Sequence, residues 1–519
     1  MEINMAVTDF LERGALINPD GLCVMMGEKQ YTYRQMVKLM NRIANGLIAL
    51  GYGLERSAAV LSDNNPDGYA CSLGIMRSAM PYVAMDFRNS AEDNCQILDW
   101  GDAEVLFYGS RFHEQVIGLK PGLPKLRHLI CIDKPMEDVP GLMDWIDPLP
   151  DTPPKVEIPS EAISWLQTGS GTAGDFKMAM QPHRAYHSFI AYQLTWLPDP
   201  KPVMLVAAPI THAGGGLSYH VLAVGGSLIL MEKPDPQLVL KAIEDYKITK
   251  LFLPPTVIYR LLDQPNVRDF DYSSLKYLAH SASPMSVDKL RIAIEVFGPV
   301  LADGYGQTEA LGIACKTPEE NFKDGKIAPD FRLSACGRPA IPYCRTVIMN
   351  DNNEIVPQGE TGEICVRGDQ VMAGYYKNPY ATRKTIIDGW CHTGDVGFFD
   401  DEGYLHIIDR KKDMIITGGF NVYPTEIEQV IMSLDAVSDC SVIGVPDDNW
   451  GEAVKAVVEL VSGKSVTDKE IIALVKQRLG SVKAPKTVDF IEELPRSTRG
   501  KVLKRVLRDR YWEGKGRKI

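Results

Sequence analysis

Several signatures that would assign this chain to a common protein class are missing. Ten cysteines are spread from Cys23 to Cys440, and none of them forms a C-x-x-C pair. This spacing argues against a zinc site and against the disulfide framework of a small secreted protein, so we expect buried thiols.

Targeting and membrane signals are absent as well. The stretch Met1 to Asn4 has no basic region followed by an apolar run, and no apolar stretch approaches the length of a membrane span. The last residues, Lys518-Ile519, do not form a peroxisomal Ser-Lys-Leu signal. We therefore expect a cytoplasmic protein without a transmembrane segment.

Positive charge is in deficit. The 56 Lys and Arg against 67 Asp and Glu give a formal net charge of -11, which disfavours non-specific binding to nucleic acid. With 24% charged and 45% hydrophobic residues, the composition is typical of a soluble globular protein. A chain of 519 residues is too long for one ordinary core and predicts two or more domains.

The stretch from Leu166 to Met180 combines residue types that suit a loop around a polyphosphate. Its glycines let backbone N–H groups approach an anion, and hydroxyls and a lysine add donors and charge: Gly169, Ser170, Gly171, Thr172, Gly174 and Lys177. A Walker loop or a dinucleotide fingerprint must lead directly into a helix. Here a short apolar run ends at Pro182, which predicts a strand. Taken alone, the stretch is equally compatible with a flexible surface turn.

Short apolar runs alternate with amphipathic segments through the first half of the chain, which predicts an α/β layer fold. Buried strands are expected at residues 203–208, 227–231, 250–253 and 276–280, and helices at 236–247, 256–264 and 286–297. This order predicts parallel βαβ units, in which ligands bind at the carboxyl ends of the strands.

Three candidate site segments follow such strands. His212 precedes Gly214–Gly216, which we expect to leave space beside it, although a histidine with a purely structural role is the alternative. Ser281, Ala282 and Ser283 are small enough for a flat base to lie against the backbone, but Ser286 could equally cap the next helix. The third segment is Asp303-Gly304-Tyr305-Gly306-Gln307-Thr308-Glu309, a combination that chance would rarely produce.

Polar and glycine-containing segments continue toward the C-terminus. The two carboxylate oxygens of Asp395 suit a pair of ribose hydroxyls, and Arg410 can assist as a donor, although residues 409–413 also fit an exposed charged turn. Gly418-Gly419 permits close backbone approach or an ordinary tight turn. A basic run follows, with Lys501, Lys504, Arg505, Arg508 and Arg510.

In this order, the motifs resemble those of the adenylate-forming superfamily, which comprises acyl-CoA synthetases, peptide-synthetase adenylation domains and luciferases. The similarity covers nearly the whole chain. The superfamily loop is similar to Ser-Gly-Thr-Thr-Gly-x-Pro-Lys-Gly, and this chain has Ala173, Phe176 and Met178 where threonine, proline and glycine are usual. The alanine removes one hydroxyl that could donate to a phosphate.

The resemblance implies roles for these residues. Tyr305, in the signature with Asp303 and Gly304, stacks on adenine, Thr308 donates to the α-phosphate and Glu309 holds Mg²⁺. The Ser281–Ser283 segment borders adenine, and His212 lies at the mouth of the acyl pocket. Asp395 and Arg410 contact the ribose. Nearer the C-terminus, the resemblance implies that Gly418 and Gly419 form a tunnel for the pantetheine arm, that Trp450 lies near CoA, and that Lys501 contacts the acid carboxylate and the α-phosphate.

The resemblance also implies a large N-terminal adenylation domain, residues 1–411, and a small mobile α+β lid domain, residues 412–519, that turns about Lys412. The lid is predicted as a helix at 424–434, strands at 439–445 and 453–461, and a helix at 468–479. The implied enzyme is an AMP-forming acyl-CoA synthetase of fatty acid and lipid metabolism that uses ATP, Mg²⁺ and CoA to activate a hydrophobic carboxylic acid. Ile210, Leu217 and Ala279 are expected to line the acid's pocket.

Three alternatives remain open. The acyl group could be loaded onto a carrier-protein phosphopantetheine, or the chain could bind nucleotide without turnover. The basic C-terminal run could also contact nucleic acid or the surface of an anionic membrane. The sequence leaves the acid and the oligomeric state open, with a homodimer as one option.

Overall fold

The computed structural model describes residues 5–169, 177–496 and 502–513. The chain divides into two compact units. The larger holds the described residues of Met1–Gly171, Phe176–Thr346 and Val366–Cys391, and the smaller holds those of Val347–Cys365 and His392–Ile519. The segment Val347–Cys365 thus joins the smaller unit although it precedes Lys412, and the predicted boundary at Lys412 stays a prediction.

Two sheets form the framework of the larger unit. The first has the order β17 (Arg338–Pro339), β14 (Ala314–Lys316), β13 (Leu301–Tyr305), β12 (Tyr277–His280), β11 (Lys250–Phe252), β9 (Val203–Val206), β10 (Ser227–Leu230), β1 (Leu22–Met26) and β2 (Lys29–Thr32). The second has the order β20 (Gly374–Tyr375), β8 (Met178–Pro182), β7 (Ile163–Thr168), β4 (Tyr82–Ala84), β3 (Ser57–Leu61), β5 (Ala103–Tyr108) and β6 (His128–Cys131). Strands β9 to β13 pair in parallel, as the βαβ pattern predicts.

Helices cover both faces of each of these two sheets. Successive residues of a strand point to opposite sides of the sheet, so neighbouring residues belong to different cores. On β3, Ala58 and Val60 belong to a core shared with residues of the first sheet, whereas Ala59 and Leu61 face a separate core. The helices in the shared core are α1 (Asp9–Ile17), α2 (Tyr33–Ala49), α3 (Pro66–Arg77), α6 (Leu142–Ile146), α7 (His183–Trp196) and α8 (Ala213–Ala223).

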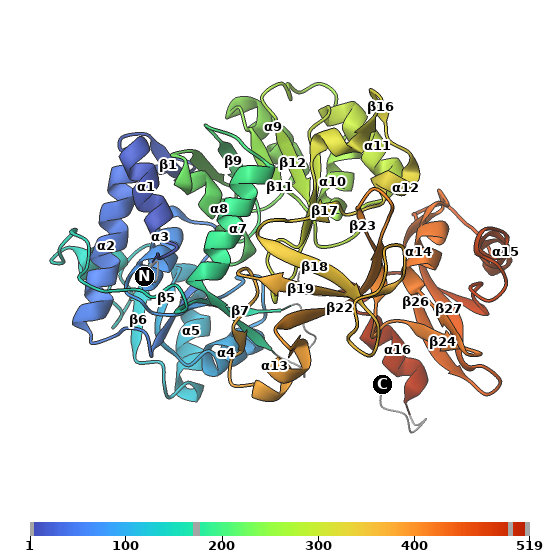
Figure 1. The fold of residues 1–519 in the computed structure, drawn as a ribbon. Coiled ribbons are helices and arrows are strands. Elements are labelled where there is room, and N and C mark those ends of the chain that lie inside the picture. The colour runs from blue at the N-terminus through green and yellow to red at the C-terminus, as the bar shows by residue number, and fades with distance from the viewer. Residues whose placement is uncertain (1–4, 170–176, 497–501, 514–519) are drawn as a thin grey trace. The chain divides into compact units, whose positions relative to one another are not determined.

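The outer faces carry their own helices. The second sheet is covered by α4 (Ala91–Trp100) and α5 (His113–Leu119), and the first by α9 (Pro236–Asp245), α10 (Pro255–Leu262) and α11 (Val287–Phe297). Figure 1 shows α9 to α11 beside β11 and β12. The predicted α/β layer fold is confirmed, and the strands and helices expected between residues 203 and 297 form within a few residues of their predicted bounds.

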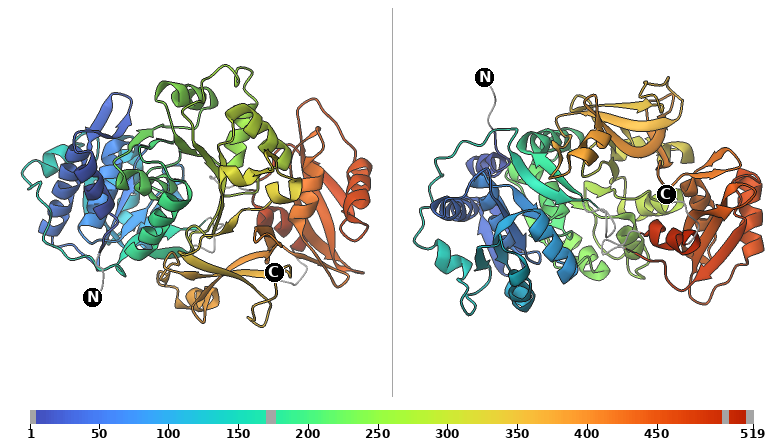
Figure 2. Two further views of the ribbon diagram at one scale, coloured as in Figure 1. Left: turned by 45° about the horizontal axis from the view of Figure 1, so that its top comes forward. Right: turned by 90° about the horizontal axis from the view of Figure 1, so that it is seen from below.

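In the smaller unit, one sheet has the order β25 (Phe420–Val422), β24 (Ile415–Thr417), β27 (Gly451–Leu460) and β26 (Val437–Asp447), with β28 (Thr487–Ile491) parallel to β27. Val442 on β26 faces a core with α14 (Pro424–Met432) and α15 (Asp468–Leu479), whereas Ile443 faces a core with α16 (Lys504–Trp512). These helices lie on opposite sides of the sheet (Figures 1 and 2). The α+β arrangement predicted for this region is confirmed.

A further sheet is built from β18 (Cys344–Met349), β19 (Gly362–Gly368), β22 (Trp390–Phe399) and β21 (Ile386–Ile387), with β23 (Leu405–Arg410) paired to β22. Helix α13 (Pro379–Thr385) precedes β21. Strands β22 and β23 matter for the site because they align Asp395 with Arg410.

None of the ten cysteines, all of which lie in the described residues, forms a disulfide, and all are buried except Cys95, which is half-buried. The expectation of buried thiols is therefore confirmed for nearly all of them. In the part of the chain that the structure describes, no helix is both long enough and apolar enough to cross a bilayer.

A buried histidine makes the fold sensitive to acid. The Val7 amide N–H donates to Nδ1 of His183 over 3.0 Å, and His183 is 1% exposed, so its imidazole must stay neutral. Burial, assisted by His187, lowers the pKa of His183 to about 3. An unfolded histidine has a pKa of about 6.5, so below that pH the unfolded state takes up a proton that the folded state does not.

We therefore expect His183 to reduce the free energy of unfolding by about 1.4 kcal/mol for each pH unit between about 6.5 and 3. Thermal unfolding of the wild type and of His183→Gln between pH 7 and 5 measures this contribution. The midpoint should fall less steeply in the variant, whereas His128→Gln, at a half-buried position in β6, should keep the wild-type slope. Equal slopes in the wild type and His183→Gln would contradict this account.

Candidate functional site

The predicted phosphate loop joins two antiparallel strands. Thr168 at the end of β7 pairs with Met178 at the start of β8, and Lys177 leads into the strand predicted after it. Lys177 itself is described. The other candidates in this loop, Ser170, Gly171, Thr172 and Gly174, lie outside the described residues, as does Lys501.

Strand β8 also places the segment that carries Thr308 and Glu309. The side-chain amide of Gln181 donates to the Thr308 carbonyl, and the Met372 N–H donates to the Glu309 carbonyl over 2.9 Å. Ala310 bridges to Val371, just before β20, which pairs with β8. Lys177, Thr308 and Glu309 are thus brought into one region by pairing between distant segments.

Tyr375 on β20 contacts two of the predicted site residues. Its hydroxyl donates to Oε1 of Glu309 over 2.6 Å, and the Lys177 ammonium lies 5.4 Å from its ring centroid, within range of a cation–π interaction. Burial, followed by the Glu309 charge, raises the pKa of Tyr375, so the hydroxyl stays a proton donor. The ring is 6% exposed and packs with Ala179 and Ala381.

The carboxyl ends of β12 and β13 bring His280 and Asp303 into register. Nδ1 of His280 lies 3.6 Å from an Asp303 oxygen, and burial lowers the pKa of the histidine. In the loop that follows β12, Ser281 and Ser283 flank Ala282, which has a φ of 77°, a strained value for a residue with a Cβ. Ser286 occupies the N-cap position of α11, but its side chain makes no capping hydrogen bond.

The backbone at Gly304 has an open face. A Cβ at this position would find its nearest neighbour, the His280 carbonyl oxygen, 3.9 Å away. Tyr305, the next residue on β13, is buried at 9% exposure. An open backbone surface beside an aromatic residue can accept a flat base.

His212 is the N-cap residue of α8 and is buried at 4% exposure. Its loop is held by hydrogen bonds from the Tyr82 hydroxyl to the Thr211 carbonyl and from the Thr211 hydroxyl to the Met85 carbonyl. Burial raises the pKa of nearby Asp86, but Arg88 and, to a smaller degree, His212 lower it, so the net shift is downward. His212 therefore sits beside a buried carboxylate.

The glycines expected to leave space beside His212 leave none through their missing side chains. A Cβ on Gly214 would lie 2.6 Å from the Ala208 carbonyl oxygen, and one on Gly215 would overlap the Ile210 carbonyl. At Gly216 the neighbour is the ring of Tyr186, 3.0 Å away. These glycines allow α8 to pack closely against its own loop and α7, and they do not enlarge a pocket.

In the smaller unit, β22 and β23 align Asp395 with Arg410, and the Arg410 Nε lies 3.0 Å from an Asp395 oxygen. Asp395 is 4% exposed. Glu363 on β19 supports this region, because it accepts the Gly394 N–H over 3.0 Å and pairs with Lys411. Burial by itself would raise the pKa of Glu363, but the hydrogen bonds from His392 and Lys411 lower it to about 2.

The turn after β23 contains Lys412, an exposed residue whose carbonyl accepts a hydrogen bond from Arg508 on α16 over 3.4 Å. Close to it in sequence, Gly418 and Gly419 form the two-residue loop of the β24–β25 hairpin. Their φ angles are 57° and 84°, as a tight hairpin turn of this type requires. The tight-turn interpretation of these glycines is therefore confirmed.

Trp450 lies against this turn. The Gly418 N–H donates to the Trp450 carbonyl over 2.8 Å, and a Cβ on Gly418 would overlap the indole, whereas one on Gly419 would meet open space. The indole is 49% exposed. The structure thus joins Gly418, Gly419 and Trp450 on one half-open surface of the smaller unit.

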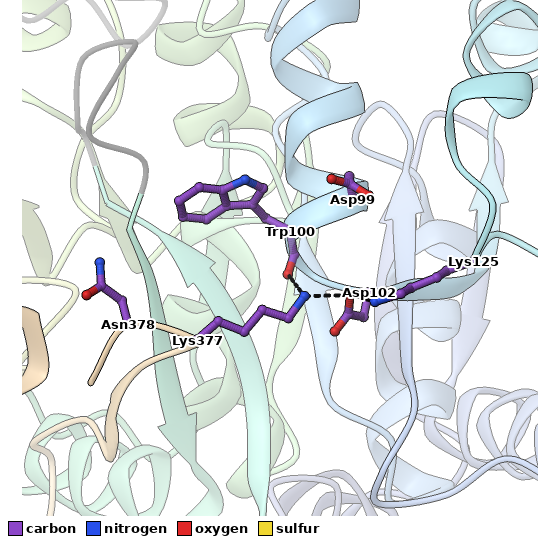
Figure 3. Close-up of a pocket in the computed structure, with 6 residues that line it drawn as sticks. All are labelled: Asp99, Trp100, Asp102, Lys125, Lys377 and Asn378. Atoms are coloured by element: carbon purple, nitrogen blue, oxygen red, sulfur yellow. Dashed lines mark hydrogen bonds and ion pairs between the residues drawn. The ribbon is translucent and has the colours of Figure 1, made fainter. Parts of the chain in front are cut away.

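A pocket of about 300 Å³ lies elsewhere, at the end of α4. Figure 3 shows the Lys377 ammonium beside the Asp102 carboxylate and the Trp100 carbonyl, at 2.6 and 3.2 Å. Lys125 also binds Asp102. The remaining lining residues are Asp99 and Asn378, so none of the predicted site residues lines this pocket.

Three side chains that support the site escaped the sequence analysis: Gln181, Tyr375 and Glu363. Each acts through a contact with a segment far along the chain, which local sequence patterns do not reveal. The doublet Gly374-Tyr375 was the one available signal, because a glycine followed by an aromatic residue marks a close approach of the backbone. Gly374 has a φ of 140°.

The chemistry of the site suits a magnesium ion that arrives with nucleotide. Among the described residues, no cluster of three His, Cys, Asp or Glu could hold a metal. A single carboxylate such as Glu309 nevertheless fits Mg²⁺, which usually keeps several waters and binds one or two protein carboxylates together with substrate phosphates.

Comparison with known proteins agrees with the motifs. The family described as AMP-binding enzyme matches residues 11–376, and the AMP-binding enzyme C-terminal domain matches residues 426–501. A medium/long-chain-fatty-acid–CoA ligase of Mycobacterium tuberculosis is 33% identical, over 96% of this chain and 88% of the relative. A feruloyl-CoA synthase of Amycolatopsis sp. is 32% identical, over 98% of this chain and 99% of the relative.

The fold agrees with a solved structure as well. ATP-bound MatB of Rhodopseudomonas palustris superimposes with a TM-score of 0.88 at 26% identity, covering 98% of this chain and 99% of that one. With these matches extending over nearly its whole length, the chain belongs to the AMP-binding enzymes, the adenylate-forming superfamily, in their acid–CoA ligase branch.

Proposed function

We propose that this protein activates a hydrophobic carboxylic acid with ATP and transfers the acyl group to CoA, releasing pyrophosphate and AMP. The observation that carries the proposal is the meeting of Lys177, Thr308 and Glu309 at β8 and β20. A site for a nucleoside triphosphate needs a cation, a hydrogen-bond donor to phosphate and a carboxylate suited to Mg²⁺.

The reaction would proceed in two steps. In the first, a carboxylate oxygen attacks the α-phosphorus of ATP, the bond to the bridging oxygen of the β-phosphate breaks, and pyrophosphate leaves. In the second, the CoA sulfur attacks the acyl carbonyl, the C–O bond to AMP breaks, and the thiol proton goes to solvent or phosphate. The protein positions the reactants and offsets their charge, and no protein nucleophile is required.

The nucleoside contacts follow from the two units taken separately. In the larger, Tyr305 and the open backbone at Gly304, followed by Ser281–Ser283, would accept adenine, and His212 would lie near the acid. In the smaller unit, Asp395 would accept hydrogen bonds from the ribose hydroxyls, and Arg410 pairs with its carboxylate. We further propose that residues 1–411 and 412–519 act as two domains about Lys412, with Lys501 serving the first step.

The acceptor and the acid are finer points of the same proposal. Gly418, Gly419 and the half-exposed Trp450 provide a surface for the pantetheine arm of CoA. The two relatives described above are named for a fatty acid and for ferulate, which supports an aliphatic or aryl acid with an apolar body. Ile210 is buried in the core between the two sheets, whereas Leu217, which packs against that core, and Ala279 are half-buried and are the candidates for lining.

The test is pyrophosphate release with ATP and Mg²⁺ across medium-chain, long-chain and hydroxycinnamic acids, with and without CoA, with products identified by mass. We expect AMP and one acyl-CoA series to accumulate, and Glu309→Gln, which keeps the side-chain size, to be strongly impaired. An acyl-AMP that CoA does not discharge would point to a carrier protein as acceptor. No pyrophosphate with any acid, despite ATP binding, would contradict the proposal.

Lys501→Ala should separate the two steps. Because this cation would offset charge as the carboxylate approaches ATP, we expect adenylation to fall by about 10²- to 10³-fold, while supplied acyl-AMP is still converted to the thioester. Arg505→Ala, on the exposed surface of the basic helix α16, is the matched control and should retain both steps. Equal loss of the two steps in Lys501→Ala would contradict the assigned role.

Gly418→Ala should show the opposite pattern. The new Cβ must displace the Trp450 indole, and the alanine must keep the positive φ of the glycine. We therefore expect thioester formation to fall by about 10-fold or more while adenylation persists. Gly419→Ala carries a similar φ penalty but meets open space, and it separates backbone strain from the displaced indole. Separate rate measurements of adenylation and of thioester formation distinguish the variants. A uniform loss of both steps would argue against a CoA surface here.

A further inference from the structure

Tyr375 lies between two residues of opposite charge that the proposed function requires. Its hydroxyl donates to Oε1 of Glu309 over 2.6 Å, and its ring faces the Lys177 ammonium at 5.4 Å. In the part of the chain that the structure describes, no ion pair joins Lys177 directly to Glu309. A direct pair would neutralise both groups and would occupy the carboxylate that a metal ion needs.

The position of Tyr375 is strongly determined. Its backbone pairs with Ala179 of β8, two residues after Lys177, and its N–H donates to the Thr382 hydroxyl over 2.9 Å. The Thr382 hydroxyl in turn donates to the Asn378 carbonyl over 2.9 Å. The ring has little freedom to follow a moving carboxylate, so the carboxylate must conform to the hydroxyl.

The residues that follow fasten this strand to a separate part of the unit. The Tyr376 hydroxyl donates to Asp102 over 2.9 Å, and Lys377 binds the same carboxylate at 2.6 Å (Figure 3 draws the lysine). Two adjacent tyrosines therefore make the same kind of hydrogen bond to two different carboxylates. Only the bond of Tyr375 reaches a predicted site residue.

We propose that Tyr375 is a positioning residue that orients the Glu309 carboxylate for Mg²⁺ and keeps Lys177 apart from it. The hydroxyl occupies Oε1, which leaves the second oxygen for the ion, while the ring holds the ammonium without a hydrogen bond to Glu309. The inference rests on the proposed function, because it assigns Glu309 to Mg²⁺ and Lys177 to phosphate. Groups that orient a metal ligand commonly change metal affinity by 10- to 100-fold when removed.

The test measures metal binding without turnover. Binding of Mn²⁺, as a stand-in for Mg²⁺, is followed by electron paramagnetic resonance in the presence of α,β-methylene-ATP for the wild type, Tyr375→Phe and Tyr376→Phe. We expect the dissociation constant for Mn²⁺ to rise about 10-fold in Tyr375→Phe, which keeps the ring under Lys177, and to stay at the wild-type value in Tyr376→Phe. Melting temperatures of the two variants serve as a check on folding.

A double-mutant comparison separates positioning from a general structural effect. If Tyr375 acts through Glu309, Tyr375→Phe should change Mn²⁺ binding by less than about 2-fold in a Glu309→Gln background. The same loss in both backgrounds, or wild-type affinity in the single variant, would overturn the inference while leaving the proposed function intact. A wild-type protein that binds no Mn²⁺ with the analogue would overturn both.

Discussion

The short antiparallel contact between β20 and β8 is the interaction on which the proposed nucleotide site depends. It brings residues 371–375 alongside the segment that carries Thr308 and Glu309 and alongside the end of the phosphate loop. The pairing involves few residues, yet it places a phenol, an ammonium and a carboxylate within one region. A buried phenol can serve both charges, because its hydroxyl favours an anion and its ring face favours a cation.

The layered architecture explains why these groups meet at one edge of the larger unit. Strands β9, β12 and β13 run in parallel, so their carboxyl ends, and the loops carrying His212, Ser281–Ser283 and Thr308, lie along the same side of one sheet. Helices between the sheets bury large side chains against the facing sides of both sheets. The close packing at Gly214–Gly216 belongs to the same construction, because it lets α8 approach the carbonyls of its own loop.

The smaller unit divides its polar groups into two clusters. Asp395 on β22 pairs with Arg410 on β23, and Glu363 on β19 pairs with Lys411, so each of these carboxylates has a cationic partner. Gly418, Gly419 and Trp450 form a separate, partly apolar surface on a hairpin turn. This separation suits the proposed chemistry, because ribose hydroxyls require paired acceptors and donors, whereas a pantetheine arm requires a narrow surface that backbone can approach.

The sequence by itself determined the class of fold, the order of strands and helices between residues 203 and 297, the strand after Lys177 and the family. These features depend on periodicity and on motifs whose residues are adjacent in the chain. Only the tertiary structure decided that Tyr375 bonds Glu309, that Glu363 supports the Asp395 region, and that the glycines after His212 are packed rather than open. Tyr375 and Glu309 are 66 residues apart, and no local pattern records a contact over that separation, because it forms only when two sheet strands pair.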